Sequence, residues 1–330
     1  MKILITGAEG FIGSHLTEAL VKKGHSIKCL TLYNSFNNWG WLETFPVEIK
    51  NKIEVIPGDV RDKELITKVM KKVDIVFNLA ALIGIPYSYK APRSYVDTNI
   101  NGILNILNAA RELNTKQVIH TSTSEVYGSA QSIPITEHHP IIGQSPYSAS
   151  KIGADQMALS YHKSFNLPVT IIRPFNTFGP RQSSRAVIPT IITQILKDQP
   201  IKLGSTNPTR DFTFVEDTVA GMVSAINNKK SIGEIINIGS GFEISINKLY
   251  LTISKLMDKK LKLIKSKNRI RPKNSEVMRL CASIKKAEKI LKWKPKYKKL
   301  KGLEEGLGKT IKWFKNKENL KHYKTDIYNY

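Results

Sequence analysis

Short apolar runs alternate with longer amphipathic stretches through the first half of the chain. Runs rich in Ile, Val and Leu predict buried strands at residues 2–6, 26–32, 53–56, 74–77, 117–121 and 169–173. Between them, apolar positions that recur every three or four residues predict helices, among them 11–23, 62–72 and a long helix over 92–113 with Pro92 in its first turn. Strands and helices that alternate in this way favour a parallel, doubly wound α/β sheet.

The pattern loosens after residue 174, which indicates a second, smaller α/β lobe. We expect a helix at 187–197, a return of the chain to the first domain through 211–215 and 234–238, and a helical, Lys-rich segment from Ser245 onward. The predicted division is a dinucleotide-binding domain of residues 1–174 with 211–242, and a smaller C-terminal substrate lobe of residues 175–210 with 243–330. The 330 residues are enough for two such units that share a cleft.

Three glycines follow the first predicted strand directly and open the first helix. Gly7 permits a tight turn, Gly10 lets the backbone approach a pyrophosphate, and Gly13 allows the helix to pack closely on the strand. The helix N-terminus adds free amides and the positive end of a dipole. This arrangement predicts a Rossmann-type, doubly wound parallel sheet that binds a dinucleotide, and the cofactor is expected to be NAD or NADP.

Other residues at the carboxyl ends of the predicted strands complete the expected cofactor site. Asp59 follows the third strand, where it would accept from the adenine amine or lie in a solvent-facing turn. Small residues after the fourth strand would let a cofactor lie across the strand ends. The full set of cofactor-binding candidates is Gly7, Gly10, Phe11, Ile12, Gly13, Thr31, Asp59, Val60, Leu79, Ala80, Ala81, Asn99, Tyr147 and Lys151.

The end of the second predicted strand carries neither of the two residue types that distinguish NAD from NADP. An Asp or Glu there would bind the ribose 2′-hydroxyl of NAD, and an Arg would hold the 2′-phosphate of NADP, but the sequence is Thr31-Leu32-Tyr33-Asn34. Because no carboxylate is present at that position to repel a phosphate, the pattern slightly favours NADP. The aromatic-rich segment that follows, residues 33–45, is interpreted as a lid, a subunit contact or a loop packed on its own domain.

The segment from Ile119 to Lys151 carries the candidate catalytic chemistry. Tyr147 and Lys151 are four residues apart, so a helix would place both on one face. An ammonium beside a phenol stabilises the phenolate and lowers its pKa, which makes Tyr147 a candidate general base toward an alcohol. On a surface helix the same pair is ordinary solvated decoration. Its place after the fifth predicted strand, where doubly wound sheets bind ligands, favours the catalytic interpretation.

A formal net charge of +24 raises the question of an anionic partner. The lysines are scattered without an arginine-rich or aromatic-interleaved segment, so we expect a solvated basic surface and no nucleic-acid partner. No apolar run is long enough to span a bilayer and no leader pattern follows Met1, so a cytoplasmic protein without membrane contact is expected. Cys29 and Cys281 have neither disulfide nor metal-ligand spacing, so no metal site is expected.

Several motifs together carry a family resemblance over nearly the whole chain. In order they are Gly7-x-x-Gly10-x-x-Gly13, Asp59-Val60, Asn78-Leu79-Ala80-Ala81, Tyr147-x-x-x-Lys151, Arg173-Pro174-x-Asn176-x-x-Gly179-Pro180-Arg181 and Arg210-Asp211-Phe212. The chain resembles the extended short-chain dehydrogenase/reductases of the NAD-dependent epimerase/dehydratase family, which act on nucleotide sugars. The resemblance implies an NAD(P)-dependent enzyme with a nucleotide-sugar substrate and a tightly bound, recycled cofactor.

The segment after the fifth predicted strand reports the reaction within that family. Ser122-Thr123-Ser124-Glu125 resembles the 4,6-dehydratases, especially GDP-mannose 4,6-dehydratase, although UDP-glucuronate decarboxylases share it. Residues 33–41 are similar to the GDP-N-acetylglucosamine 4,6-dehydratases of legionaminic acid biosynthesis. The resemblance implies a hydro-lyase that forms a 4-keto-6-deoxy sugar from GDP-N-acetylglucosamine. UDP-sugar 4,6-dehydration, UDP-glucuronate decarboxylation and a non-catalytic nucleotide- or RNA-binding module are the alternatives.

The resemblance also implies a role for each catalytic candidate. Tyr147, assisted by Lys151, takes the proton of the sugar 4-hydroxyl while hydride passes from C4 to the cofactor, and hydride returns to C6 after water is lost. Glu125 takes the C5 proton, and Thr123 orients the 4-hydroxyl. Ser124 stands where many relatives have Asp, so either Glu125 or a water bound to Ser124 protonates the leaving hydroxyl.

The substrate contacts and the assembly follow from the same resemblance. The nucleotide diphosphate would be held by Asn176, Arg185, Arg210 and Arg271. We expect a homodimer or a higher homo-oligomer through the helices that begin near Ser94 and Ser145.

Overall fold

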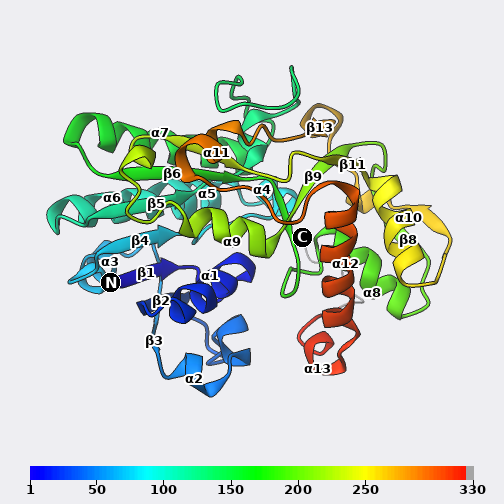
Figure 1. The fold of residues 1–330 in the computed structure, drawn as a ribbon, viewed down its shortest axis with the longest axis horizontal. Coiled ribbons are helices and arrows are strands. Elements are labelled where there is room, and N and C mark those ends of the chain that lie inside the picture. Colours follow the sequence, from blue (N-terminus) through cyan, green and yellow to red (C-terminus); the bar gives the residue numbers. More distant parts are fainter. Residues whose placement is uncertain (325–330) are drawn as a thin grey trace.

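One parallel sheet forms the centre of the larger part of the molecule in this computed structural model, which describes residues 1–324. Its strand order is β10-β6-β5-β4-β1-β2-β3 (Figure 1). The strands are β1 (Lys2–Thr6), β2 (Ser26–Leu32), β3 (Ile53–Gly58), β4 (Ile75–Asn78), β5 (Gln117–Thr121), β6 (Val169–Pro174) and β10 (Ile235–Ile238). The chain winds from β1 out to β3, then crosses to β4 and continues outward. The predicted doubly wound sheet is therefore confirmed, and its direction reverses between β1 and β4.

Helices cover both faces of the sheet because successive strand residues point to opposite sides. Leu4 belongs to a core cluster with α3 (Lys63–Met70), α6 (Gly102–Glu112) and α7 (Pro146–Phe165). Its neighbours Ile3 and Ile5 belong to another cluster with α1 (Phe11–Lys22), α9 (Val215–Val223) and α11 (Lys285–Leu291). Both faces are buried, which explains why the strands read as continuous apolar runs.

The long helix predicted over residues 92–113 is interrupted. It consists of α5 (Pro92–Tyr95), a π-helical turn over Val96–Asn101, and α6. The wider turn buries the side chain of Asn99, which bonds both backbone groups of Leu82. A hydrophobic period of 3.6 does not reveal one π turn, and such turns occur frequently at functional sites.

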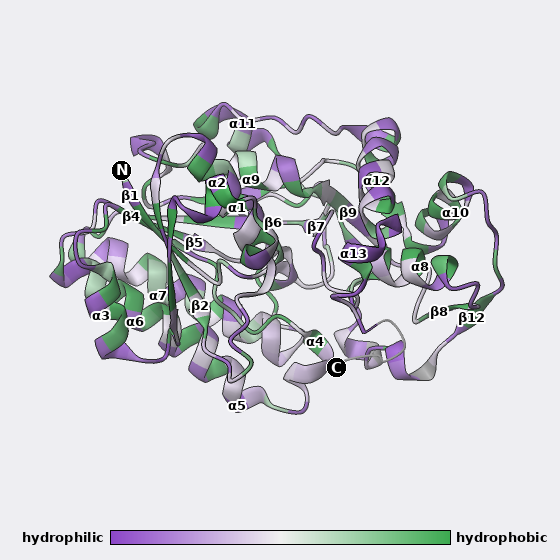
Figure 2. Ribbon diagram, turned by 90° about the horizontal axis from the view of Figure 1, so that it is seen from below, coloured by the Kyte–Doolittle hydropathy of each residue, from purple (hydrophilic) through white to green (hydrophobic). Residues whose placement is uncertain are grey.

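A second region holds two smaller sheets and most of the C-terminal helices (Figure 2). Strand β9 (Thr209–Phe214) pairs with β7 (Asn176–Phe178), β11 (Glu243–Ser245) and β13 (Arg279–Leu280), and β8 (Ile201–Leu203) pairs with β12 (Leu263–Lys265). The helices of this region are α8 (Val187–Leu196), α10 (Ile246–Leu256), α12 (Lys299–Lys315) and α13 (Lys317–Leu320).

The expected return of the chain through residues 211–215 is wrong for most of that segment. Residues 211–214 lie in β9, inside the small sheet, and the chain rejoins the large sheet through α9 and β10. The misreading arose because a buried apolar strand has the same pattern in either sheet. The exact division of the chain into two domains stays a prediction.

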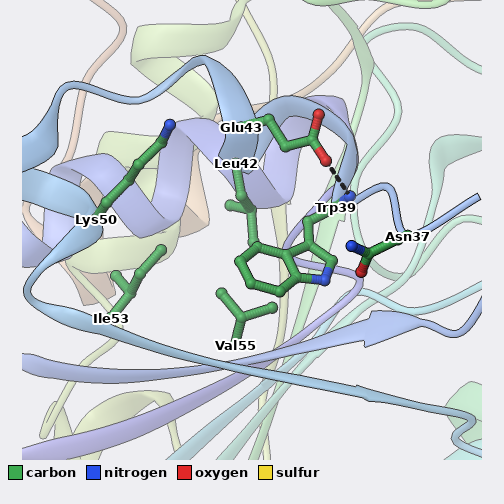
Figure 3. A pocket seen from close by; sticks show the side chains of 7 residues that line it. All are labelled: Asn37, Trp39, Leu42, Glu43, Lys50, Ile53 and Val55. Atoms are coloured by element: carbon green, nitrogen blue, oxygen red, sulfur yellow. Dashed lines mark hydrogen bonds between the residues drawn. The ribbon is translucent and has the colours of Figure 1, made fainter.

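The aromatic segment 33–45 packs partly on its own chain. The ring of Trp41 lies 5.4 Å from those of both Trp313 and His322, so the segment reaches the C-terminal helices. Its tip is open, since Phe36 is 89% exposed. A cavity of about 390 Å³ lies between this segment, the short helix α2 (Val47–Lys50) and β3, and the indole of Trp39 is directed toward Val55 there (Figure 3).

Within residues 1–324, no helix is both long and apolar enough to cross a membrane.

Candidate active site

The carboxyl end of β5 and the first turns of α7 bring the catalytic candidates together. Ser145 caps α7 by accepting from the amide of Ser148, and Tyr147 and Lys151 follow on the inner face. The Thr123 hydroxyl accepts from the amide of Glu125 and acts to lower the pKa of the Tyr147 phenol, and Lys151 Nζ donates to Thr121 O at 2.7 Å. The predicted cluster therefore forms from two elements that meet at the edge where doubly wound sheets bind ligands.

The protonation of the Tyr147–Lys151 pair differs from the expectation. Burial raises the pKa of Tyr147, the hydrogen bond from Thr123 opposes this, and the Glu125 charge raises it further. Burial lowers the pKa of Lys151 to about 8, against the opposing charge of Asp155. Sequence spacing suggests an ammonium that acidifies a phenol, but burial disfavours the charged form of both groups and is the largest influence on the pKa of each. Tyr147 is therefore a phenol at neutral pH in the protein alone.

A buried polar network around Asp155 lies next to Tyr147 and Lys151. Asp155 Oδ2 accepts from Ser122 Oγ at 2.8 Å and from Arg173 Nη2 at 2.8 Å, and Oδ1 lies 3.5 Å from His120 Nε2. Burial would raise the pKa of Asp155, but His120, Arg173 and Lys151 together hold it below its ordinary value. Burial lowers the pKa of His120 to about 4, so its imidazole is neutral.

The network extends across the sheet in both directions. His120 Nδ1 lies 3.1 Å from the amide of Asn78, which accepts from Thr6 at 2.8 Å. On the other side, Arg173 lies 4.9 Å from the centre of the Tyr127 ring. The strand ends below the site are thus fixed by side-chain contacts as well as by the ladder.

Glu125 lies on a 3₁₀ turn over Ser124–Tyr127, and its carboxylate faces the second region. Its Oε2 is 3.3 Å from Arg271 Nη1, and Arg210 Nη2 is 3.3 Å from Glu276 Oε1. The charge of Glu125 also acts on Arg210, so the four side chains form one cluster. Two of the four predicted diphosphate ligands, Arg210 and Arg271, are therefore beside the predicted C5 base.

The other two substrate candidates approach from separate strands and loops. Asn176 is in β7, and its Oδ1 is buried without a hydrogen-bond partner among the described residues. The Arg185 guanidinium lies against Gly84, where an added Cβ would come within 2.4 Å of Nη1. Tyr95 donates to Gly84 O, and its ring is 6.2 Å from that of Tyr147. Arg185 is thus connected to the reaction centre through Tyr95.

The glycine loop fits a dinucleotide. Gly7 has φ +68° and an added Cβ would meet the Ala80 backbone at 3.0 Å, while at Gly13 a Cβ would lie 2.1 Å from Gly7 O. Gly10 starts α1 in extended conformation, and no described side chain caps this end. The first-turn amides of Phe11 and Ile12 are therefore open to a phosphate, as the sequence predicts.

Several cofactor candidates are already engaged within the chain. The Asp59 carboxylate is held by Arg61 at 2.5 Å, and Asn105 donates to Val60 O. Thr6 Oγ1 accepts from the amides of Leu79 and Ala80. The Asn99 amide bonds Leu82 and Ser150, so it positions the loop that contains Ala81. The Thr31 hydroxyl is buried without a partner among the described residues. Direct cofactor contact by these residues stays a prediction.

Sequence reasoning missed the residues that support the site from outside the motifs. These are Tyr95, His120, Asp155, Arg173 in its ion-pair role, and Glu276. The one signal was the spacing of Asp155, which lies one further turn along α7 from Lys151 on the same helix face.

Comparisons with known proteins agree with this geometry. Residues 4–306 match the family model described as GDP-mannose 4,6 dehydratase. The chain is 33% identical to a UDP-N-acetyl-alpha-D-glucosaminuronate decarboxylase of Bacillus cytotoxicus, over 96% of this chain and 99% of that one. It is 33% identical to a dTDP-glucose 4,6-dehydratase of Streptomyces antibioticus, over 74% of each. A UDP-glucuronic acid 4-epimerase from Bacillus cereus, solved with NAD, has a TM-score of 0.86 at 31% identity, covering 96% and 99% of the two chains.

Fold, glycine loop and the Tyr147–Lys151 centre define a dinucleotide-dependent enzyme that modifies nucleotide sugars. The chain belongs to the NAD-dependent epimerase/dehydratase family of short-chain dehydrogenase/reductases. The expected NAD(P) cofactor is confirmed. The three relatives carry out different reactions, so family membership leaves the reaction itself to be argued from the site.

Proposed function

We propose that this protein is a 4,6-dehydratase that converts GDP-linked N-acetylglucosamine to its 4-keto-6-deoxy product. The observation that supports it is the position of Glu125, a carboxylate close enough to Tyr147 for its charge to raise the phenol's pKa. Epimerisation at C4 requires hydride removal and return at one carbon. Dehydration requires a second base for C5, and Glu125 supplies one.

The residues divide the chemistry between them. Tyr147 accepts the proton of the 4-hydroxyl, with Thr123 holding that hydroxyl in line. The glycine loop and the Tyr147 centre would hold the nicotinamide dinucleotide, which when bound would supply hydride transfer between C4 and C6 and a positive charge that favours the Tyr147 phenolate. The new 4-ketone acidifies the C5 proton, which Glu125 removes, and the C6 hydroxyl leaves as water. Lys151 donates to Thr121 O and keeps the start of α7 on the end of β5.

Proton delivery to the leaving hydroxyl falls to Glu125. Ser124 stands at the position that is Asp in many relatives, and its hydroxyl does not ionise at neutral pH. It is also only 2% exposed. After taking the C5 proton, Glu125 carries the proton that the C6 oxygen needs. One carboxyl group acting first as base and then as acid returns to its starting state in each cycle. When hydride reaches C6, C5 regains a proton, which is balanced by the proton that Tyr147 took from the 4-hydroxyl.

The choice of GDP and N-acetylglucosamine is supported by the similarity of residues 33–41 to that dehydratase group. The segment contacts the glycine loop, since Trp41 N donates to Glu9 O at 3.1 Å. Through Trp41 it also packs on Trp313 of α12, so the segment lies between the glycine loop and the second region.

The test is a substrate screen combined with Glu125→Gln. Wild-type protein given GDP-N-acetylglucosamine should yield a product lighter by one water, without added cofactor, and the variant should lose activity by about 10²–10⁴-fold. Glu234→Gln, at a partly exposed pair with Lys286, is the control and should keep full activity. Full activity in Glu125→Gln would refute the role of Glu125. Loss of carbon dioxide from a uronic acid, or a 4-epimer of unchanged mass, would refute the dehydratase.

UDP-uronate decarboxylation is the second candidate, and the position of Arg185 favours it. A uronic acid needs a cation for its carboxylate, and Arg185 approaches Tyr147 through Tyr95. UDP-glucuronate turnover that falls in Arg185→Met, with no turnover of GDP-N-acetylglucosamine, would establish this reaction instead.

A further inference from the structure

The end of β2 has no Asp or Glu of its own, but the side chain of Glu9 lies beside it. Glu9 lies in the glycine loop between Gly7 and Gly10, and its Oε1 accepts from the Leu32 amide at 3.0 Å. Leu32 is the last residue of β2. In dinucleotide-binding sheets, the acid that receives the adenosine ribose hydroxyls stands at this strand end. Glu9 thus brings a carboxylate to that point from a different segment.

The second oxygen of Glu9 has no partner. Its Oε2 is buried and makes no hydrogen bond to the described residues. Burial raises the pKa of Glu9, and the opposing contributions come from backbone hydrogen bonds, Leu32 first, with no cation among them. A buried polar atom without a partner is destabilising. Glu9 Oε2 therefore lacks a donor, which a ligand bound at the end of β2 would supply.

The surrounding chain fixes Glu9 in place. Trp41 N donates to Glu9 O at 3.1 Å, and Gly40, with φ +57°, packs so closely that a Cβ would lie 2.7 Å from the same oxygen. Asn34, a polar side chain just beyond this strand end, is engaged within the loop: its Oδ1 accepts from Phe36 N, and its Nδ2 donates to Asn38 O. Glu9 is therefore the acidic group that the loop presents.

We propose that Glu9 accepts hydrogen bonds from the adenosine ribose hydroxyls of the dinucleotide and selects NAD over NADP. A 2′-phosphate carries about two negative charges and would place them beside the partly buried carboxylate of Glu9. The resulting repulsion is strongly unfavourable. The sequence prediction of a slight preference for NADP used only the strand-end residues Thr31-Leu32-Tyr33-Asn34. With the Glu9 carboxylate at the same place, the expected preference is for NAD. The proposal concerns the cofactor only and is independent of which sugar reaction the enzyme performs.

The first experiment identifies the dinucleotide that the purified protein carries. Acid release followed by mass spectrometry should give NAD from the wild type, and NADP as the main species would overturn the proposal. The second compares NAD and NADP binding by cofactor-depleted protein, read from tryptophan fluorescence. The wild type should bind NAD at least 100-fold more tightly, and Glu9→Gln, which removes the charge and keeps an acceptor for Leu32, should reduce that ratio at least tenfold.

Glu43→Gln is the matched control. Glu43 belongs to the same aromatic segment and accepts from Trp39 N at 2.9 Å, away from the glycine loop. Its substitution should leave the NAD-to-NADP ratio unchanged. An unchanged ratio in a folded Glu9→Gln would refute the role of Glu9. If that variant does not fold, the dinucleotide released from the wild type still decides between the two cofactors.

Discussion

Two clusters of charge meet at Glu125 and Tyr147, and they are built in opposite ways. The Asp155 cluster, with His120 and Arg173, is on strands and a long helix of the large sheet, and all three side chains are at most 1% exposed. The arginine cluster consists of Arg210 and Arg271 with Glu125 and Glu276. Arg210 is in β9, Glu125 is in the 3₁₀ turn after β5, and Arg271 and Glu276 are in the loop between β12 and β13. Arg271 keeps 24% of its side chain exposed.

The difference indicates that the Asp155 cluster stabilises the fold, whereas the arginine cluster binds the substrate. Asp155 Oδ2 receives three hydrogen bonds from two side chains, Ser122 and Arg173, and Asp155 faces a neutral His120, so its partners are fixed when the protein folds. In the arginine cluster each guanidinium meets a carboxylate at 3.3 Å, and a diphosphate offers a better bidentate partner. Substrate would then draw Arg271 away from Glu125 and leave that carboxylate free to act as a base.

The largest effect is expected from Asp155→Asn. The change leaves the Arg173 guanidinium buried without its counter-charge, so the free energy of unfolding should fall by about 3–5 kcal/mol. Urea unfolding followed by circular dichroism measures it. Asp198→Asn is the control, because its pair with Lys259 is on the surface and is worth less than about 1 kcal/mol. Equal losses in the two variants would contradict the structural role of the Asp155 cluster.

The next effect concerns the charge of Lys151 at the upper edge of the same cluster. Its pKa is about 8 in the folded protein, against 10.5 as the ordinary value. Between these values the unfolded chain binds more protons than the folded one, so stability should rise with pH there. Below pH 8 both states are charged and the burial penalty is complete. Relative to Lys151→Met, the wild type should therefore gain about 2 kcal/mol in unfolding free energy from pH 7 to pH 10.

Urea unfolding of both proteins across that pH range measures the difference. Other groups titrate alike in the two proteins, so their contributions cancel. Lys163→Met, at an exposed position of the same helix, is the control. A flat difference for Lys151→Met would contradict the lowered pKa.

The parts of the molecule that could be predicted from sequence are the local ones. Gly7, Gly10 and Gly13 act within one turn, and Tyr147 and Lys151 share a helix face, so spacing alone locates them. The Asp155 cluster joins residues from β5, α7 and β6, and Arg271 is 146 residues from Glu125, so no window of sequence contains either. The direction of the Tyr147 pKa shift could not be predicted from sequence either, because the burial of Tyr147 depends on how Tyr95 and the rest of the pocket pack around it.

Residues 209–214 illustrate the same limit at the level of fold. The sequence predicts that residues 211–215 return to the large sheet, but residues 211–214 lie in β9, whose place depends on pairing with β7, β11 and β13. That pairing places Arg210 in the second region, opposite Ile244 and beside Leu280. The arginine cluster therefore exists because of a pairing that sequence does not specify locally.

The last of the three effects is expected from Arg271→Met, and it should appear in substrate binding and not in stability. Losing one charge-assisted contact to the diphosphate should raise KM about 10–100-fold, because such contacts are worth about 1.5–3 kcal/mol. The value of kcat should change less, since Glu125 no longer needs to be released from an ion pair. Arg279→Met, at a pair with Glu243 in the same region, is the control and should leave KM unchanged. A large loss of kcat at constant KM would place Arg271 in the chemical step and show that the arginine cluster holds the base in position, as the Asp155 cluster does for Lys151.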